Sequence, residues 1–294
     1  MNKILILCLL LMVSCDRTHK EYYQDGTLYK DYRLKNNFYD GLYKEYYQDG
    51  GLKVIHKYLQ GKNIDTSFYY DKKSILREKR IWLDSLKNKV ILFDNDHKTA
   101  QGFIINDTLK INDWTYFKNE KDSIVEYVIV DNTSHANQFW IKNKRGDTLW
   151  NESNDYQIYL SKNKVRLNEI VRVRLVLMDP YLNNLSDVKV LLFKDNNKSN
   201  KNFYNYKGVK KDTFLSLKND GIPHPEVPKD VLQNHIVEFG LKFKTTGSKK
   251  IKGVLREYSK GYFKDQPNKV ENFTNDLFFE KEITVIDSLD DNSL

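Results

Sequence analysis

The seven residues Lys20-Glu21-Tyr22-Tyr23-Gln24-Asp25-Gly26 return letter for letter as Lys44-Glu45-Tyr46-Tyr47-Gln48-Asp49-Gly50. The offset is 46 − 22 = 24 residues. Seven identical positions at one offset indicate a duplicated structural unit, and a period of about 20 to 50 residues is typical of repeat arrays. Because each unit of an array packs mainly on its neighbours, this stretch decides how the first half of the chain folds.

Each unit has the pattern of a β-hairpin. Residues 42–47 are rich in aromatic side chains, which favour strands, and Asp49-Gly50 supplies the left-handed backbone of a tight turn. Following the second aromatic residue forward at steps of 23 or 24 predicts further units, with the weakest one around residues 84–106. The residues of this series are Tyr23, Tyr47, Tyr70, Phe93, Phe117 and Trp140.

The Tyr-Tyr-x-x-Gly-x-Leu unit at this spacing resembles the variant MORN-type repeats of bacterial envelope proteins, which also occur in a family described as antitoxin-like. The resemblance is specific over residues 20–76 and loose from there to about residue 150. It implies a single-layer antiparallel β-meander of hairpin repeats, which we place over residues 19–152. The Gly-x-Gly spacing of the eukaryotic repeats is missing, so their proposed lipid association is not carried over.

The neighbouring tyrosines of the repeats have two interpretations. Adjacent strand residues point to opposite faces of a sheet, so both faces carry rings. The favoured interpretation is that the rings hold a thin sheet together through cross-strand pairs. The alternative is an interaction surface that stacks on a glycan or on a partner protein. The candidate residues are Tyr22, Tyr23, Tyr46, Tyr47, Tyr69 and Tyr70.

Residues 155–286 follow a different pattern, in which apolar and polar residues alternate over longer segments. The clearest segments are 168–178, 187–194, 235–244 and 249–258. With shorter segments they predict six to eight strands, which favours an immunoglobulin-like sandwich of two sheets. The proline-rich residues 222–228 predict a rigid connection between the sheets, residues 203–206 a further strand, and the polar residues 259–275 a long loop. Residues 287–294 are interpreted as a tail, and the chain is expected to be all-β.

The first residues carry a targeting signal. Residues 4–13 are an unbroken apolar run, which is shorter than the roughly 20 residues of a membrane-spanning helix but typical of a secretory signal. Met12-Val13-Ser14-Cys15 follows and resembles the bacterial lipobox. The resemblance implies a signal peptide over residues 1–14, lipid attachment at Cys15 and a short anchor over residues 15–18. The alternative is an ordinary signal peptide in which Cys15 is incidental.

A lipid anchor would place the protein in the cell envelope. Two or three acyl chains hold firmly, because each buried methylene group contributes about 0.8 kcal/mol. The outer membrane is the favoured site, on either its periplasmic or its surface face. The combination of leader, aromatic repeats and sandwich resembles uncharacterised lipoproteins of Bacteroidota-type bacteria.

Several chemistries have no support in the sequence. Both cysteines, Cys8 and Cys15, precede residue 16, so the rest of the chain can form neither a disulfide nor a cysteine zinc site. The six histidines show no metal-ligand spacing, and Asp94-Asn95-Asp96 lacks the Gly and Glu of a calcium loop, so we interpret it as a polar turn. Nucleophile-elbow, Walker and dinucleotide motifs are missing, and Glu257 has no partner that spacing identifies. No catalytic residue, metal or cofactor is expected.

The charge pattern favours an ordinary soluble surface over nucleic-acid binding. The formal net charge is +8, and the basic residues are spread among 40 Asp and Glu. One cluster is interpreted as a charged outer sheet face that discourages aggregation, with contact to anionic lipid or polysaccharide as the alternative. Its residues are Lys242, Lys244, Lys249, Lys250 and Lys252.

The leading functional hypothesis is a non-enzymatic envelope lipoprotein that acts as a repeat scaffold and protein-interaction module. A surface polysaccharide-binding or polysaccharide-processing component is the first alternative, because the repeats are rich in aromatic residues. An antitoxin-like protein is the second, and it depends on the repeat family alone. The expected partners are therefore a membrane, reached through the lipid anchor, and a protein or glycan.

Overall fold

The computed structural model describes residues 17–194, 203–228, 230–263 and 266–287. This part of the chain is built from strands, with short 3₁₀ turns and no α-helix, so the predicted all-β class is confirmed. The chain divides into two compact units, Met1–Gln101 and Gly102–Leu294, which are described separately below. Cys15 and the predicted signal peptide lie outside the described residues.

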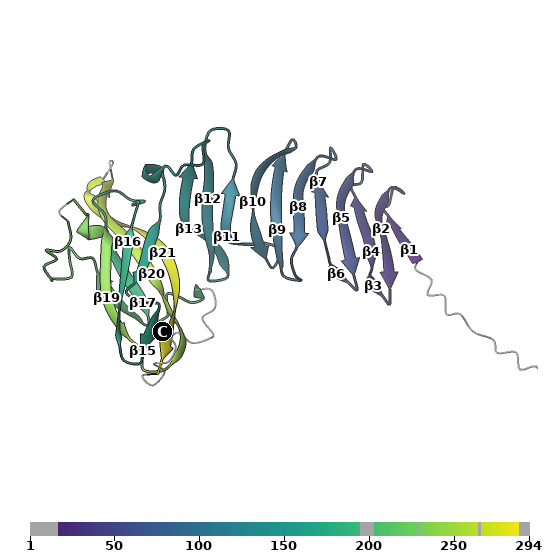
Figure 1. Cartoon of the computed structure of the whole chain (residues 1–294). Helices are drawn as coiled ribbons and strands as arrows, with labels where there is room; N and C mark the ends of the chain where they lie inside the picture. Colours follow the sequence, from purple (N-terminus) through teal and green to yellow (C-terminus); the bar gives the residue numbers. More distant parts are fainter. Residues whose placement is uncertain (1–16, 195–202, 229, 264–265, 288–294) are drawn as a thin grey trace, which may run out of the picture. The chain divides into compact units, whose positions relative to one another are not determined.

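The first sheet is an antiparallel meander in which consecutive long strands are neighbours (Figure 1). The short strands β3 and β6 pair with β2 and β5 beside this path. The strands are β1 (Arg17–Tyr22), β2 (Leu28–Lys35), β3 (Phe38–Tyr39), β4 (Gly41–Tyr46), β5 (Leu52–Leu59), β6 (Lys62–Asn63), β7 (Thr66–Tyr70), β8 (Leu76–Trp82), β9 (Lys87–Asp94), β10 (His97–Ile105), β11 (Leu109–Tyr116), β12 (Asp122–Val130) and β13 (Thr133–Lys142).

The hairpin turns at one end of the meander fix the repeat register. The amide of Tyr47 donates to the carbonyl of Gly51 (2.8 Å), and Gly50 takes a φ of 87°. The third hairpin makes the same turn from Asp71, whose amide donates to Ile75 (3.0 Å). Since 71 − 47 = 24, the equivalent of Tyr47 is Asp71, and the predicted step of 23 to Tyr70 is wrong by one residue.

The same turn recurs at the end of the meander. Asn143 donates its amide to the carbonyl of Asp147 (3.0 Å), and Gly146 takes a φ of 87°. The distance along the chain is 143 − 71 = 72 residues, which is three times 24. The predicted series followed aromatic residues, whereas the structure repeats turns. It therefore ends at Trp140, three residues before the turn residue Asn143.

Other turns of the meander, at both ends of the hairpins, use two consecutive residues with positive φ. Asn36 and Asn37 take 50° and 63°, and Asn95 and Asp96 take 46° and 63°. Such pairs form type I′ turns, whose twist matches that of the flanking strands, and Asn and Asp tolerate the left-handed region well. The segment at residues 94–96 is thus the polar turn that the sequence predicts.

The remaining strands form a three-stranded and a five-stranded sheet, in the orders β14-β16-β19 and β15-β21-β20-β17-β18. Their apolar faces enclose one core, in which Val171, Val173 and Leu175 are fully buried. The predicted connection at residues 222–228 does join the two sheets. The strands are β14 (Tyr156–Leu160), β15 (Lys164–Arg166), β16 (Ile170–Leu177), β17 (Asp187–Phe193), β18 (Lys211–Leu215), β19 (Ile236–Lys242), β20 (Gly247–Phe263) and β21 (Gln266–Ile286).

Two predicted elements of this region are wrong. Residues 259–275 are not a long loop, because β20 and β21 continue as a paired ribbon, with Ser259 opposite Phe273 and Gly261 opposite Glu271. From Ser259 onward the described residues of β20 pair with β21 alone, and a two-stranded ribbon of this kind needs no apolar alternation, so its polar sequence carries no strand signal. Residues 203–206 form turns rather than a strand.

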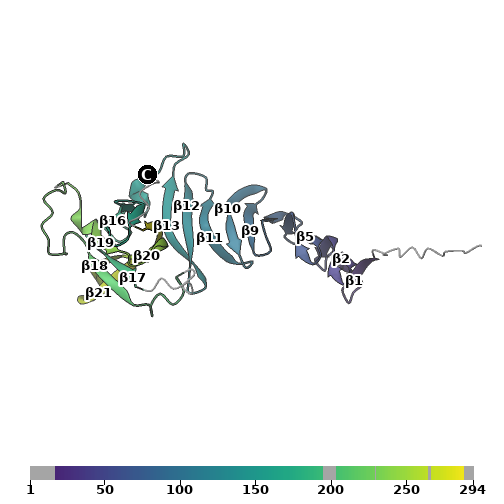
Figure 2. The ribbon, with the colours of Figure 1, turned by 60° about the horizontal axis from the view of Figure 1, so that its bottom comes forward.

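The second unit has another core, where the last hairpin of the meander packs on the five-stranded sheet. Val130 lies in this core with Val254 and Phe278, and β13 contacts β21. Figure 2 shows β12 and β13 next to the strands of this sheet. The side-chain amide of Asn137 completes the contact, since its Nδ2 donates to the Phe278 carbonyl (2.9 Å) and its Oδ1 accepts from the Phe278 amide (2.7 Å). The Asn137 side chain thus forms with Phe278 the two hydrogen bonds that a residue of a neighbouring strand would form.

Candidate functional site

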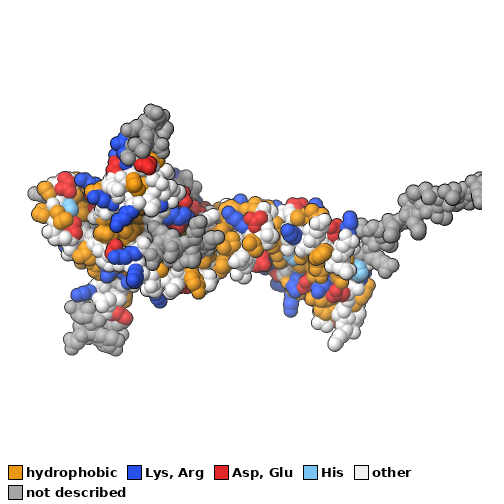
Figure 3. Space-filling model, turned by 90° about the horizontal axis from the view of Figure 1, so that it is seen from below, with side chains coloured by type: hydrophobic (Ala, Val, Ile, Leu, Met, Phe, Trp, Pro, Cys, Tyr) orange, Lys and Arg blue, Asp and Glu red, His pale blue; other side chains and the backbone are white. Residues whose placement is uncertain are grey.

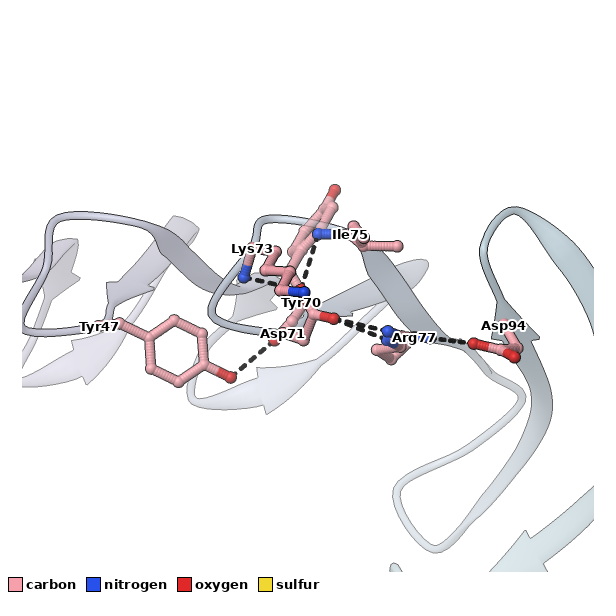
Figure 4. Close-up of polar contacts among 7 residues, drawn as sticks. All are labelled: Tyr47, Tyr70, Asp71, Lys73, Ile75, Arg77 and Asp94. Carbon is pink, nitrogen blue, oxygen red and sulfur yellow. Dashed lines mark hydrogen bonds and ion pairs between the residues drawn. The ribbon is translucent and has the colours of Figure 1, made fainter.

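Tyrosine hydroxyls join successive repeats of the first unit. Tyr23 Oη donates to the carbonyl oxygen of Tyr46 (2.8 Å), and Tyr47 Oη donates to that of Tyr70 (2.8 Å, Figure 4). Each bond spans 23 residues, from one turn to the strand end of the next repeat. We call these two bonds the tyrosine clamps. They satisfy carbonyl groups at strand ends, so they stabilise the stacking of neighbouring hairpins.

The residue that begins each of these turns also contacts the residue six positions later. The contact is made with three different chemistries: two rings, a ring and a cation, and two opposite charges. The pairs are Tyr23–Tyr29 (ring centroids 4.8 Å apart), Tyr47–Lys53 (Nζ 5.9 Å from the ring centroid) and Asp71–Arg77 (Oδ2 to Nη2, 2.8 Å). The position is therefore conserved in geometry between repeats while its chemistry changes.

Asp71 replaces a clamp tyrosine with a charged junction. Its Oδ1 accepts from the amides of Lys73 (2.9 Å) and Ile75 (3.0 Å), and Arg77 extends from Asp71 to Asp94 Oδ1 (2.5 Å, Figure 4). The Ile75 amide, followed by the Arg77 guanidinium, holds the pKa of Asp71 below its ordinary value. The link to the next hairpin is thus ionic at this repeat.

These contacts show where the tyrosines of the predicted interaction surface lie. The hydroxyls of Tyr23 and Tyr47 are used within the sheet, and Tyr69 packs against His56 (ring centroids 5.5 Å apart). Tyr22 is exposed at 58%, whereas Tyr46 and Tyr70 are half-buried. The structure thus gives the clamp tyrosines a role inside the sheet, and an interaction role for this set stays a prediction.

We expect Tyr47→Phe to speed amide exchange in β7 and β8 about fivefold, because the loss of one hydrogen bond costs about 1 kcal/mol. Hydrogen exchange measured by mass spectrometry checks this. Tyr22→Phe is the matched control, since its ring is exposed, and it should leave the exchange rates unchanged. Equal rates in both variants would show that the clamp contributes nothing.

The fold brings together two serine–histidine pairs, which the spacing of these residues in the sequence did not reveal. His56 Nδ1 lies 2.7 Å from Ser67 Oγ, and His235 Nε2 lies 3.3 Å from Ser186 Oγ. Burial lowers the pKa of both histidines, which favours neutral rings. Both serines are fully buried, so neither hydroxyl is placed to attack a substrate from solvent. In this geometry the two pairs act as packing and hydrogen-bonding elements.

The most unusual buried group is the carboxylate of Glu257 on β20, which is 0% exposed. A buried charge is costly unless its lone pairs are satisfied. Its two oxygens accept from four donors: the amides of Tyr181 (3.1 Å) and Leu182 (2.9 Å), Ser186 Oγ (2.7 Å) and Asn275 Nδ2 (3.3 Å). The carboxylate therefore fastens the segment 178–186 to the five-stranded sheet.

A second loop is fastened to the first. Asn234 Nδ2 donates to the carbonyl of Ser186 (2.5 Å), and His235 Nε2, 3.1 Å from the same oxygen, donates to it as well. Both side chains are buried, and they precede β19 directly. The described parts of segments 178–186, 216–228 and 230–235 therefore form one end of the sandwich, on a common hydrogen-bonded base that contains Glu257.

This end of the sandwich exposes apolar side chains. Leu185 is 92% exposed and Tyr181 63%, and a hollow of about 450 Å³ lies beside Leu185. Large exposed apolar side chains grouped on a well-ordered base are typical of interaction sites. We call this surface the apolar loop end. Its exposed residues are Met178, Tyr181, Leu185, Ile222, Val231 and Leu232.

Charges on the visible face of the molecule are mixed. Figure 3 shows Lys and Arg side chains interspersed with Asp and Glu and with apolar side chains. Among the residues that the structure describes, no group of three or more His, Cys, Asp or Glu could hold a metal ion. No helix in the same described ranges is long and apolar enough to cross a membrane.

Comparison with protein families, with curated proteins and with solved structures gave no match to this chain. The functional argument therefore depends on the motif at Cys15 and on the geometry of the apolar loop end.

Proposed function

We propose that this chain is a non-enzymatic cell-envelope lipoprotein with variant MORN-type repeats that acts as a scaffold and protein-interaction module. A lipid on Cys15 would hold the chain at the outer membrane. The repeat meander would serve as a spacer, and the sandwich would carry the partner contact. The sequence Met12-Val13-Ser14-Cys15 supports the anchor, because it has the order of apolar, small and cysteine residues of a lipobox.

The observation that carries the interaction role is the apolar loop end. Leu185 and Tyr181 belong to the segment whose backbone is held by Glu257, which accepts hydrogen bonds from two of its amides. A loop that is ordered before binding loses less conformational entropy when a partner docks, so the apolar contact is retained as affinity. Aromatic and aliphatic anchors at the centre of an interface contribute most of its energy.

Lipidation predicts a simple fractionation result. We expect Cys15→Ala to move the protein from the membrane fraction to the soluble fraction of native cells, because the acyl chains would be lost. Cys8→Ala is the matched control, since Cys8 lies within the apolar run of the leader, and it should leave the protein in the membrane fraction. A membrane-bound Cys15→Ala protein would rule out the anchor.

The partner contact can be tested in native cells with a photoreactive residue. Placed at position 185, it should give a discrete crosslinked species. Placed at Leu86, which is also exposed (61%) but belongs to the first unit, it should not. Leu185→Asp with the crosslinker at 181 should weaken the same band. Crosslinking of equal strength at 86 and 185, or none at either position, would remove the support for the apolar loop end.

A further inference from the structure

A second hollow lies at the end of the sandwich opposite the apolar loop end, at the other ends of strands β17 and β20. It measures about 610 Å³ and lies where β17 and β19 end and β18 begins. Its floor is apolar, its rim carries lysines, and its only lining acid among the described residues is Asp212. We call it the lysine groove. Its lining residues are Leu192, Phe193, Leu241, Phe243 and Ile251 on the floor and Lys194, Lys242, Lys244, Lys250 and Lys252 around it.

The positive charge of the lysine groove is only partly balanced. Lys194 pairs with Asp212 (2.6 Å), and Glu280 pairs with Lys250 (2.5 Å) and Lys252 (3.3 Å). Glu282 lies 3.7 Å from Lys250 as well, so five lysines meet three pairing carboxylates, of which only Asp212 lines the groove among the described residues. An anionic occupant would complete the balance, and its attraction would be strengthened by the apolar floor, which lowers the local dielectric.

The strands that flank the groove are both at sheet edges. In the described part of the chain, β19 is the last strand of the three-stranded sheet and β18 the last of the five-stranded sheet. An edge strand presents unpaired amide and carbonyl groups, which are a template for one more strand. Phe214 on β18 stacks on Phe239 of β19 (ring centroids 4.2 Å apart), and the groove is lined by Asp212 and Leu241, two residues further along each strand.

We propose that the lysine groove binds an extended acidic peptide of a partner protein, added as a strand along the part of the β19 edge that lies at the groove, beyond Ile236, whose carbonyl accepts from the Leu217 amide. Alternate side chains of a strand point to opposite sides, so a peptide that alternates apolar and acidic residues would meet both the floor and the lysines. This proposal rests on the proposed interaction function and names the chemistry of a second contact. A polysaccharide would satisfy the charge but would supply no peptide groups to the strand edge.

The test is the binding of a fluorescein-labelled octapeptide of alternating valine and aspartate to the full chain, measured by anisotropy. We expect saturable binding that weakens about tenfold in Lys242→Glu/Lys244→Glu, since each reversed charge repels the peptide. Lys118→Glu/Lys144→Glu changes the net charge equally at exposed positions away from the groove and is the matched control. No saturable binding, or equal loss in both variants, would overturn the proposal.

Backbone pairing is tested by N-methylation of the peptide in its two registers. A strand uses alternate amides on one edge, so methylation of one set should abolish binding and methylation of the other should not. Equal effects of both sets, or tighter binding of a heparin fragment through the same lysines, would show a polyanion site instead. Leu185→Asp should leave the peptide affinity unchanged, so failure at the groove is distinguishable from failure at the apolar loop end.

Discussion

A chain carrying Glu257→Ala is expected to lose about 3 to 5 kcal/mol of its free energy of unfolding in the second unit, because neutral hydrogen-bond donors would be left unsatisfied. The four donors that Glu257 satisfies would lose their acceptor together. Two of these donors are backbone amides, which cannot rotate away to find water. Each buried donor left without a partner costs about 1 to 3 kcal/mol. Urea unfolding followed by tryptophan fluorescence measures the loss.

Two further variants show whether the stability loss comes from the buried hydrogen bonds of Glu257 or from the loss of any negative charge. Glu257→Gln keeps the shape but turns one acceptor into a donor, which would face the donors already present, so an intermediate loss is expected. Glu238→Ala removes a carboxylate that pairs with Arg174 on an exposed face and should cost less than about 1 kcal/mol. If Glu257→Ala were no worse than Glu238→Ala, the proposed base of the apolar loop end would be wrong.

The same variant links stability to function. In conditions where Glu257→Ala is still folded, segment 178–186 should exchange its amides faster than the strands do. Crosslinking through position 185 should then fall, because the apolar side chains would no longer be held on an ordered base. A stable variant that kept full crosslinking would show that the order of the loop is irrelevant to partner binding.

Strand alternation in the sequence predicted the sandwich well. Val171, Val173, Leu175 and Leu177 lie on one face of β16, and all are buried. The signal is strong because one face of a packed sheet must be apolar and the other must meet water. The boundary drawn after residue 152 stays a prediction, and the division into compact units falls within β10.

The repeat register was only partly predictable. The identity between residues 20–26 and 44–50 is exact in letters, but the third turn exchanges a tyrosine for Asp71 and a glycine for Ser74, which takes a φ of 60°. Aspartate keeps the turn because its carboxylate accepts from the turn amides, a function that aromatic spacing does not reveal. Turn chemistry, and not ring position, is what the repeats share.

The base of the apolar loop end could not be read from the sequence. Three of the donors to Glu257 lie 71 to 76 residues away, and two of them are backbone amides of residues whose side chains carry no hint of the contact. A lone glutamate in an alternating strand is normally taken as solvent-facing. One feature of the sequence did indicate burial. Glu257 follows the buried Leu255 by two residues, and residues two apart in a strand share a face.

The second large effect is expected at Gly102 on β10. A Cβ atom at this position would lie 2.4 Å from ring atoms of Trp114, whose side chain is only 2% exposed. The indole cannot move freely, because its Nε1 also donates to the carbonyl of Phe103 (2.9 Å). Gly102→Ala should therefore cost about 2 to 3 kcal/mol, as overpacking of a well-filled site does.

A double-mutant cycle shows whether the indole is the cause. Trp114→Leu alone should be destabilising by about 3 kcal/mol, because it removes a large buried ring. In that background Gly102→Ala should cost almost nothing, so the two changes should couple by about 2 to 3 kcal/mol. Gly240→Ala in β19, where the new Cβ would meet only a methyl group of Ile170 at 3.2 Å, is the matched control. If Gly102→Ala cost the same with and without Trp114, the close packing of indole on glycine would not be what orders this part of the meander.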